Sequence, residues 1–464
     1  MTKIVHVPTL QQRVLDASWD PANASKSLTA ILFAIYTIAV TSISSDDCQT
    51  FFDESRADLL TRYRTATVRA LFQADFLTTK DLEILQALTL FLFSNPGSEL
   101  TTTLTGATIR IAEKMGLHRE STDPQTSLFE KEMRIRLWWQ LRGLDARCRI
   151  ASTPALRKPP APSELGDIRL PLNVNDADLH PDMTEPPLEH SGPTEMMCVL
   201  MKFEVSNWHR HSPTAVKLFE NVIQGHVRNK ALIELEDKVI SELQNIYHEK
   251  YFRNSDPRIP LHRLTHAIAN ISIARLRFNI HHPRGRPTND DTEVYITREE
   301  SDILFESAII WLDAMVDVSK SSKFSSHLFT HMTTSSQMDA YIYLLSDLRR
   351  RCSGDQVALA WKLVEDLYNE HPELIDDGND FFLAFGDLTL EAWVARRNEL
   401  ALSRGGVESD GTPRFIQLLW EKRQYQNADG AELPPIFNTH GLDDFGLQDD
   451  KDLNWVYWSE LLRL

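Results

Sequence analysis

Residues 129–145 read FEKEMRIRLWWQLRGLD and carry the clearest structural signal in this 464-residue sequence. Ser127 and Glu130 form a capping box, the pattern that closes the first turn of a helix. Apolar side chains then recur every three or four residues, which places them on one helix face. They are Phe129, Met133, Leu137, Leu141, Leu144 and Cys148. The pattern predicts a helix whose apolar face is buried.

The same helical periodicity extends outward from this stretch, and very little of the sequence alternates as a strand does. Ser25 and Ser27 can cap a helix that includes LTAILFAIYTIAV, residues 28–40. Residues 82–93 are apolar on nearly every side, so that helix must be enclosed by others. Gly116 can end a further helix, since glycine takes the left-handed conformation that most residues avoid. These patterns predict an all-α fold.

The domain organisation follows from where the helical pattern changes. Residues 151–193 are rich in proline and show no sustained period, so we expect an ordered but irregular excursion. The helical pattern then continues to about residue 404, with breaks near 254–260, 283–290 and 352–354. We predict one large multi-helix regulatory domain over 21–404, after an N-terminal extension at 1–20. Residues 405–448 are predicted to be flexible because glycine, proline and aspartate dominate them.

The charge balance excludes a body that binds nucleic acid over its whole surface. The sequence has 49 basic and 66 acidic side chains, and its formal charge of −17 repels a phosphate backbone. Cys48, Cys148, Cys198 and Cys352 have neither disulfide-framework nor zinc-ligand spacing. Residues 28–40 are too few to cross a bilayer, which takes roughly 20. With no secretory signal visible, we expect an intracellular protein without metal, cofactor or membrane segment.

Four stretches resemble the middle homology region of the fungal zinc binuclear cluster transcription factors. They are LTAILFAIYTIAV at 28–40, ATIRIAEKMGLHRE at 107–120, FEKEMRIRLWWQLRGLD at 129–145, and LPLNVNDADL at 170–179, the last followed by Thr194 and Glu195. The order and spacing of these stretches match the family, and the resemblance covers about residues 20–215. It implies an all-helical domain of the fungal-specific transcription factor type, which regulates activity through intramolecular contacts, effectors or partner proteins.

The resemblance implies a structural motif and no catalytic residues. Within the motif, Trp138 and Trp139 supply large buried surface, and Arg134 and Arg136 can pair with carboxylates or bind loop carbonyls. The other motif residues are Met115, Gly116, Leu117, His118, Asp145, Pro171, Asn173, Asp176 and Asp178. We interpret this motif as scaffold.

The sequence departs from the family where DNA is normally recognised. Family members begin with six cysteines that hold two zinc ions, followed by a basic linker, and these 464 residues contain no such group. We therefore expect a nuclear regulator of transcription, in secondary metabolism for instance, that reads no specific DNA sequence alone. Protein partners, such as a DNA-binding factor or the transcription machinery, or a small-molecule effector would direct it. Alternatively, the gene continues upstream and encodes the zinc module there.

The last sixteen residues, 449–464, predict an acidic and aromatic amphipathic helix. Its candidate contact residues are large and apolar or aromatic: Trp455, Tyr457, Trp458, Leu461 and Leu462. Such a helix can dock on the domain's own core or fold into a groove on a partner. The sequence favours neither over the other.

Signals for catalysis are weak. His262 and His266, like His327 and His331, are spaced to share a metal, but sixteen histidines make such pairs expected by chance. The DDGND string at 376–380 matches a magnesium-binding pattern, and we interpret it as a solvated turn. The second hypothesis is nevertheless a cofactor-independent cyclase or isomerase, built on a recruited regulator domain with a cavity between helices as its reaction vessel.

Overall fold

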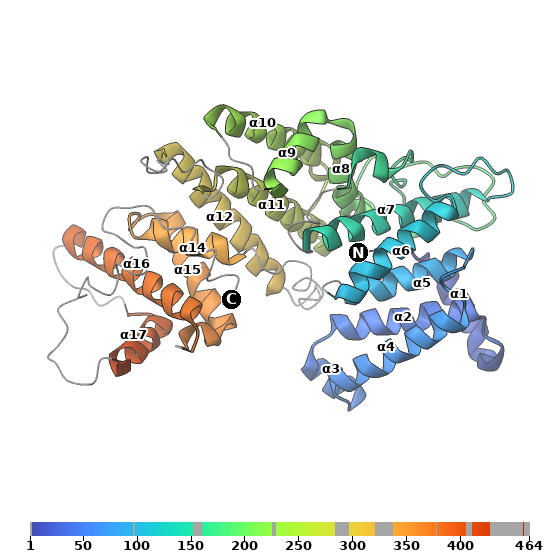
Figure 1. The fold of residues 1–464 in the computed structure, drawn as a ribbon, viewed down its shortest axis with the longest axis horizontal. Helices are drawn as coiled ribbons and strands as arrows, with labels where there is room; N and C mark the ends of the chain where they lie inside the picture. Colours follow the sequence, from blue (N-terminus) through green and yellow to red (C-terminus); the bar gives the residue numbers. More distant parts are fainter. Residues whose placement is uncertain are drawn as a thin grey trace. The chain divides into compact units, whose positions relative to one another are not determined.

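The computed structural model describes residues 2–95, 98–151, 160–224, 229–283, 297–320, 337–376, 378–404, 411–426 and 458. Throughout these ranges the chain is helical or irregular, and its extended pairing is one isolated bridge between Arg119 and Asp167. The prediction of an all-α fold is therefore confirmed (Figure 1).

The chain forms two compact units. Unit 1 comprises Met1–Gly225, Lys238–Ala269 and Val318–Thr334, and unit 2 comprises His226–Asp237, Asn270–Asp317 and Ser335–Leu464. The predicted borders at residues 20 and 404 remain predictions.

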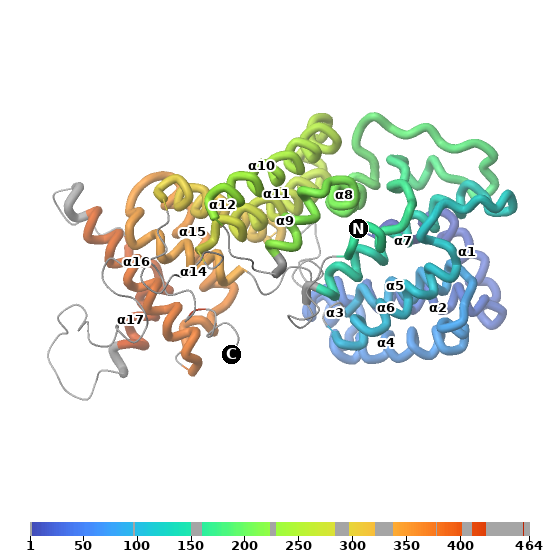
Figure 2. The backbone as a smooth tube through the Cα atoms, turned by 45° about the horizontal axis from the view of Figure 1, so that its top comes forward, coloured from blue at the N-terminus to red at the C-terminus, as the bar shows by residue number. Residues whose placement is uncertain are grey.

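Unit 1 contains the motif and the helices around it. Its helices are α1 (Val7–Trp19), α2 (Lys26–Ser42), α3 (Ser45–Phe52), α4 (Arg56–Gln73), α5 (Leu82–Phe93), α6 (Glu99–Lys114), α7 (Leu128–Ala151), α8 (Met197–His211) and α9 (Pro213–Gln224). Helix α2 packs against α4 and α5 (Figure 2), and α6 packs against both α5 and α7. Two further helices, α10 (Lys230–Tyr247) and α11 (Pro260–His281), have residues in both units.

The helix starts in unit 1 follow the predicted capping chemistry. The Ser25 hydroxyl accepts a 3.1 Å hydrogen bond from the Leu28 amide, and the Ser127 hydroxyl accepts one of 3.1 Å from the Glu130 amide. Each bond satisfies an amide that has no partner within its own helix. Helix α5 is buried along almost its whole length, as its apolar sequence predicted.

The N-terminal residues, predicted as an extension, pack into unit 1. Ile4 is fully buried in the same apolar core as Trp138 and Trp139. The Ile4 carbonyl accepts a 2.6 Å hydrogen bond from the side-chain amide of Gln86 on α5. The chain ahead of α1 therefore contributes to the core.

Unit 2 also packs helix on helix. It contains most of α12 (Arg298–Ser319), together with α14 (Gln337–Leu348), α15 (Asp355–Glu370), α16 (Asp380–Arg404) and α17 (Arg414–Gln426). Helix α16 packs against α14 and α17. The break predicted near 254–260 lies just ahead of α11, and the break predicted near 352–354 lies between α14 and α15. Of the break predicted near 283–290, only Pro283 is among the described residues.

Residues 414–426, inside the segment predicted to be flexible, form helix α17. Phe415, Ile416 and Leu419 are all at most 5% exposed, and they occupy one face of this helix. The prediction averaged composition over the whole segment, so its glycines, prolines and aspartates hid a short amphipathic stretch. The rest of that segment, except residues 411–413, lies outside the described residues.

Candidate functional site

A buried ionic network lies at the centre of the motif. Arg136 on α7 is fully buried, and its Nη1 donates a 2.8 Å hydrogen bond to Oδ1 of Asp176. Its Nε donates to Oε1 of Glu132, one turn earlier on α7, at 3.4 Å. Glu132 also accepts a 3.0 Å bond from Nη2 of Arg169. The network therefore joins α7 to the irregular excursion that follows it.

The N-terminal residues complete this network. Nζ of Lys3 lies 3.0 Å from Oδ2 of Asp176, and Nε2 of His6 is hydrogen bonded to the Asp176 carbonyl at 2.8 Å. Burial by itself raises the pKa of the Asp176 carboxyl, but the hydrogen bonds from Arg136 and Lys3 outweigh burial and hold that pKa below its ordinary value. Asp176 therefore stays ionised and joins three separate segments of unit 1.

The depressed pKa of Asp176 predicts a pH dependence of stability. The stabilisation is expected to be complete above about pH 4, the ordinary pKa of an aspartate, and to be lost as the pH falls through the folded-state pKa. The Asp176→Asn protein should therefore have a lower urea midpoint than the native chain near neutral pH. When the pH is lowered from about 6 to about 3, its urea midpoint should fall by less than that of the native chain. Parallel acid profiles for the two proteins would show that Asp176 does not contribute in this way.

The two tryptophans bind the irregular excursion to α7. Trp138 Nε1 donates a 2.8 Å hydrogen bond to the Leu165 carbonyl, and Trp139 Nε1 donates one of the same length to the Arg169 carbonyl. Both indoles are at most 1% exposed. Arg210 on α8 lies over the Trp139 ring, 5.4 Å from its centre. Each tryptophan thus combines a large buried surface with a bond that orders the loop backbone.

The M-G-L-H part of the motif forms the end of α6 and crosses the excursion. Gly116 has a φ of +80°, and the following Leu117 is fully buried and donates its amide to the Ala112 carbonyl at 2.9 Å. The carbonyl of Met115 accepts a hydrogen bond from Arg134 on α7. The His118 carbonyl accepts a 3.0 Å bond from the Asp167 amide. This turn therefore anchors α6 to both α7 and the excursion.

The remaining motif residues organise the excursion itself. The Asn173 side chain donates to the carbonyls of His190 and Gly192 at 2.8 and 2.9 Å, and accepts a 2.7 Å bond from the Thr194 hydroxyl. Oδ2 of Asp178 lies 2.8 Å from Nε2 of His190. Pro171 is buried. These contacts fold the Pro-rich segment back on itself. They explain how its described part is ordered without an α-helix, since it contains only the short 3-10 helices Pro162–Leu165 and Asp176–Asp178.

Asp145 takes part in a second ion-pair cluster near the end of α7. It lies 3.0 Å from Arg149 and 3.4 Å from Arg142, and both arginines also pair with Glu164 of the excursion. Arg142 lies over the Trp138 ring, 5.6 Å from its centre. Sequence reasoning missed Glu164, Arg210 and the N-terminal residues, because no local pattern indicates which distant side chain a buried arginine meets.

In the histidine pairs and the DDGND string, the side chains that the structure describes bond to nearby residues. Nδ1 of His262 accepts a 3.0 Å bond from the Asp256 amide, and Nε2 of His266 lies 2.7 Å from the Ser255 hydroxyl. His327 and His331 lie outside the described residues. In the DDGND string, Asn379 accepts a 2.7 Å bond from the Phe381 amide at the start of α16. Across the described ranges, no three His, Cys, Asp or Glu side chains are placed to hold a metal ion.

The C-terminal segment is represented by Trp458 alone. This side chain is 1% exposed, and its ring centre lies 6.2 Å from that of Phe381 on α16, edge to face. Trp455, Tyr457, Leu461 and Leu462 lie outside the described residues. Trp458 therefore packs on unit 2.

The part of the chain that contains this motif matches a known protein family. Residues 2–219 match the family model described as fungal specific transcription factor domain. The aurofusarin cluster transcription factor aurR2 of Gibberella zeae is 32% identical over 502 aligned residues, which cover 100% of this chain and 73% of the relative. The chain belongs to this family of fungal transcription factors. The matched residues, 2–219, include the whole motif of unit 1.

Two further relatives extend the comparison. The transcriptional regulator AacuB of Aspergillus aculeatus is 31% identical, and the pyriculol/pyriculariol biosynthesis cluster transcription factor 1 of Pyricularia oryzae is 30% identical. Each alignment covers 90% of this chain and 56% of the relative, so the chain spans just over half the length of these two proteins. All three relatives are named as regulators, and the hypothesis of a cyclase or isomerase finds no support among them.

The sequence predicts no membrane-spanning segment. None of the described helices combines the length and the apolar content that a bilayer crossing needs.

Proposed function

We propose that this chain is a nuclear regulator of transcription for a fungal secondary-metabolite gene cluster, and that it acts through protein partners or a bound effector. The alignment with aurR2 over the whole chain carries this proposal, since that relative is named as the transcription factor of a biosynthetic cluster. AacuB and the Pyricularia factor, which bear similar names, add support.

The chemistry of unit 1 fits a regulator better than a catalyst. Arg136, Asp176 and the two tryptophans are buried and already bonded to other parts of the protein. Their bonds are made within the protein, so these groups stabilise unit 1 and are not directed at a substrate. Regulation therefore has to operate through surfaces or through a pocket, and the net charge of −17 disfavours phosphate contact over most of that surface.

Within this proposal the C-terminal residues divide into two roles. We assign docking on the chain's own unit 2 to Trp458, which packs against Phe381. Partner binding is assigned to Trp455, Tyr457, Leu461 and Leu462, because acidic and aromatic sequences fold into apolar grooves on their partners.

A reporter experiment tests the function. The 464-residue chain, fused to a foreign DNA-binding module, should activate a reporter in a filamentous fungus above the level of the module alone. Trp455→Ala combined with Tyr457→Ala should lower this activity several-fold at equal protein level. Trp19→Ala is the matched control, because Trp19 is 90% exposed at the end of α1 and should be neutral.

The outcomes separate the parts of the proposal. Reporter output no higher than that of the module alone, at a confirmed protein level, would overturn the activating role. Full activity in the Trp455→Ala and Tyr457→Ala variant would overturn the assignment of partner binding to the C-terminal segment.

A further inference from the structure

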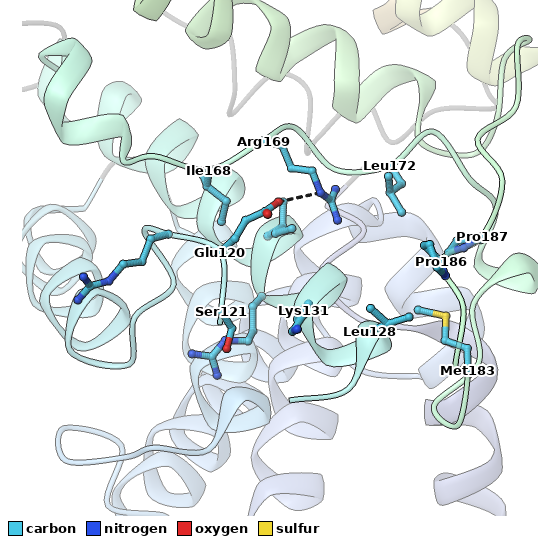
Figure 3. A pocket seen from close by; sticks show the side chains of 13 residues that line it. Glu120, Ser121, Leu128, Lys131, Ile168, Arg169, Leu172, Met183, Pro186 and Pro187 are labelled. Carbon is cyan, nitrogen blue, oxygen red and sulfur yellow. Dashed lines mark ion pairs between the residues drawn. The ribbon is translucent and has the colours of Figure 1, made fainter. Parts of the chain in front are cut away.

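A small pocket lies beside the first turn of α7, between the motif and the Pro-rich excursion (Figure 3). Its volume is about 240 Å³. Its walls come from the turn after α6, from α7 and from the excursion, and its lining includes Ser121, Leu128, Lys131, Ile168, Leu172 and Met183. All of these residues belong to unit 1.

The pocket has an excess of positive charge in an acidic protein. Four lining side chains are cationic, Arg119, Lys131, Arg134 and Arg169, whereas Glu120 is the one carboxylate in the lining. A site lined by one sign of charge concentrates ligands of the opposite sign. The pocket therefore favours an anion.

Two of the four cations already serve the fold. Arg169 lies 3.0 Å from Glu120 and 3.0 Å from Glu132, and Figure 3 marks its pair with Glu120. Arg134 lies 3.1 Å from Glu130. Arg119 and Lys131, in contrast, make no ion pair with any described residue. Arg119 is exposed to solvent, whereas Lys131 is only partly exposed. Lys131 is therefore the charge that a ligand in the pocket can neutralise.

Apart from Ser121, the uncharged lining residues are apolar, and they suit a flat ligand. In Figure 3 Met183, Pro186 and Pro187 stand on one side of the pocket, near Leu128 and Leu172. Proline rings offer flat apolar faces, and a methionine sulfur makes favourable contacts with aromatic rings. The volume falls below the roughly 300–1,000 Å³ of sites for drug-sized ligands, so the ligand is small.

We propose that this pocket binds a small aromatic carboxylate, with the carboxylate on Lys131 and the ring against Met183 and the two prolines. The idea that this ligand is the effector of the chain rests on the proposed function. The binding of the ligand to the pocket does not depend on it. The binding is therefore tested on the purified chain, where a negative result leaves the reporter experiment unaffected.

Calorimetric titration of the full chain with benzoate tests the proposal. Saturable binding of benzoate at one site is expected. Benzamide should bind much more weakly because it lacks the charge, and acetate should bind much more weakly because it lacks the ring. Lys131→Met should weaken benzoate binding by roughly tenfold or more, because a hydrogen bond to a charged group is lost while the apolar stem is kept. Glu120→Gln should strengthen it by removing a competing carboxylate.

Matched controls make the result specific. Lys217→Met removes one positive charge from the surface of α9, away from the pocket lining, and should leave benzoate affinity unchanged. With methyl-labelled methionines, benzoate should shift the Met183 resonance, which Met183→Leu identifies by its disappearance. Equal binding of benzamide, no saturable binding of benzoate at millimolar concentration, or native affinity in Lys131→Met would each overturn the proposal.

Discussion

Replacing Arg136 by alanine is expected to lower the free energy of unfolding of the chain by about 3–5 kcal/mol, the usual cost of removing one partner from a buried ion pair. The guanidinium is fully buried, and it is hydrogen bonded to both Asp176 and Glu132. Without it, two carboxylates with little exposure to water lose a positive partner. Lys3 still pairs with Asp176 and Arg169 still pairs with Glu132, but among these three cations only Arg136 is bonded to both carboxylates.

A double-mutant cycle tests this network. Asp176→Ala should also destabilise the chain strongly, because it leaves Arg136 and Lys3 without their shared carboxylate. The two substitutions together should cost less than the sum of the single ones, since each removes the orphan charge that the other creates. Urea unfolding of the three variants measures the difference, and additive costs would show that the two side chains are not coupled.

Arg134→Ala is the matched control on the same helix. Arg134 is 18% exposed and bonds to the Met115 carbonyl and to the half-exposed Glu130. Water can therefore replace part of what it supplies, and a cost of only about 1–2 kcal/mol is expected. A cost equal to that of Arg136→Ala would mean that burial of the ion pair is not the source of the effect.

The sequence predicted the helices well because their signals are local. The capping serine Ser127 and the apolar repeat after it lie within one helix, so no distant residue is needed to recognise α7. Trp138 and Trp139, which enter through the family resemblance and not through this repeat, are at most 1% exposed. Even α17 has an apolar repeat of its own, although the repeat is short and the segment around it is rich in glycine, proline and aspartate.

The partners of the motif residues could not be predicted in the same way. Lys3 and Asp176 are 173 positions apart, and nothing in either segment names the other. The pocket shows the same limit, since Lys131 and Met183 come together only because the excursion folds back over α7. A charged residue between apolar neighbours, as Arg136 is between Ile135 and Leu137, can indicate that a buried partner exists, but it does not indicate where in the chain that partner lies.

Gly166 is a position that sequence reasoning missed, and Gly166→Ala is expected to cost roughly 2–5 kcal/mol of stability, from about 1–2 kcal/mol for a left-handed backbone and about 1–3 kcal/mol for overpacking. Its φ is +79°, and a Cβ there would lie 2.3 Å from the His118 carbonyl oxygen. That oxygen accepts the bond from the Asp167 amide, and the Gly166 carbonyl accepts a 3.0 Å bond from Arg210.

The methyl group therefore meets a backbone atom that cannot yield without breaking the crossing between the α6 turn and the excursion. Gly143→Ala is the control within α7, because Gly143 is exposed and a Cβ there would meet no other atom within 4 Å. Alanine in a helix interior is also better than glycine by about 0.5–1 kcal/mol. The melting temperature and the urea midpoint should thus fall for Gly166→Ala and rise for Gly143→Ala. If the Gly166→Ala protein were as stable as the native chain, the contact between the excursion and the His118 carbonyl could be lost without a change in stability. The motif would then contribute less to stability than its hydrogen bonds indicate.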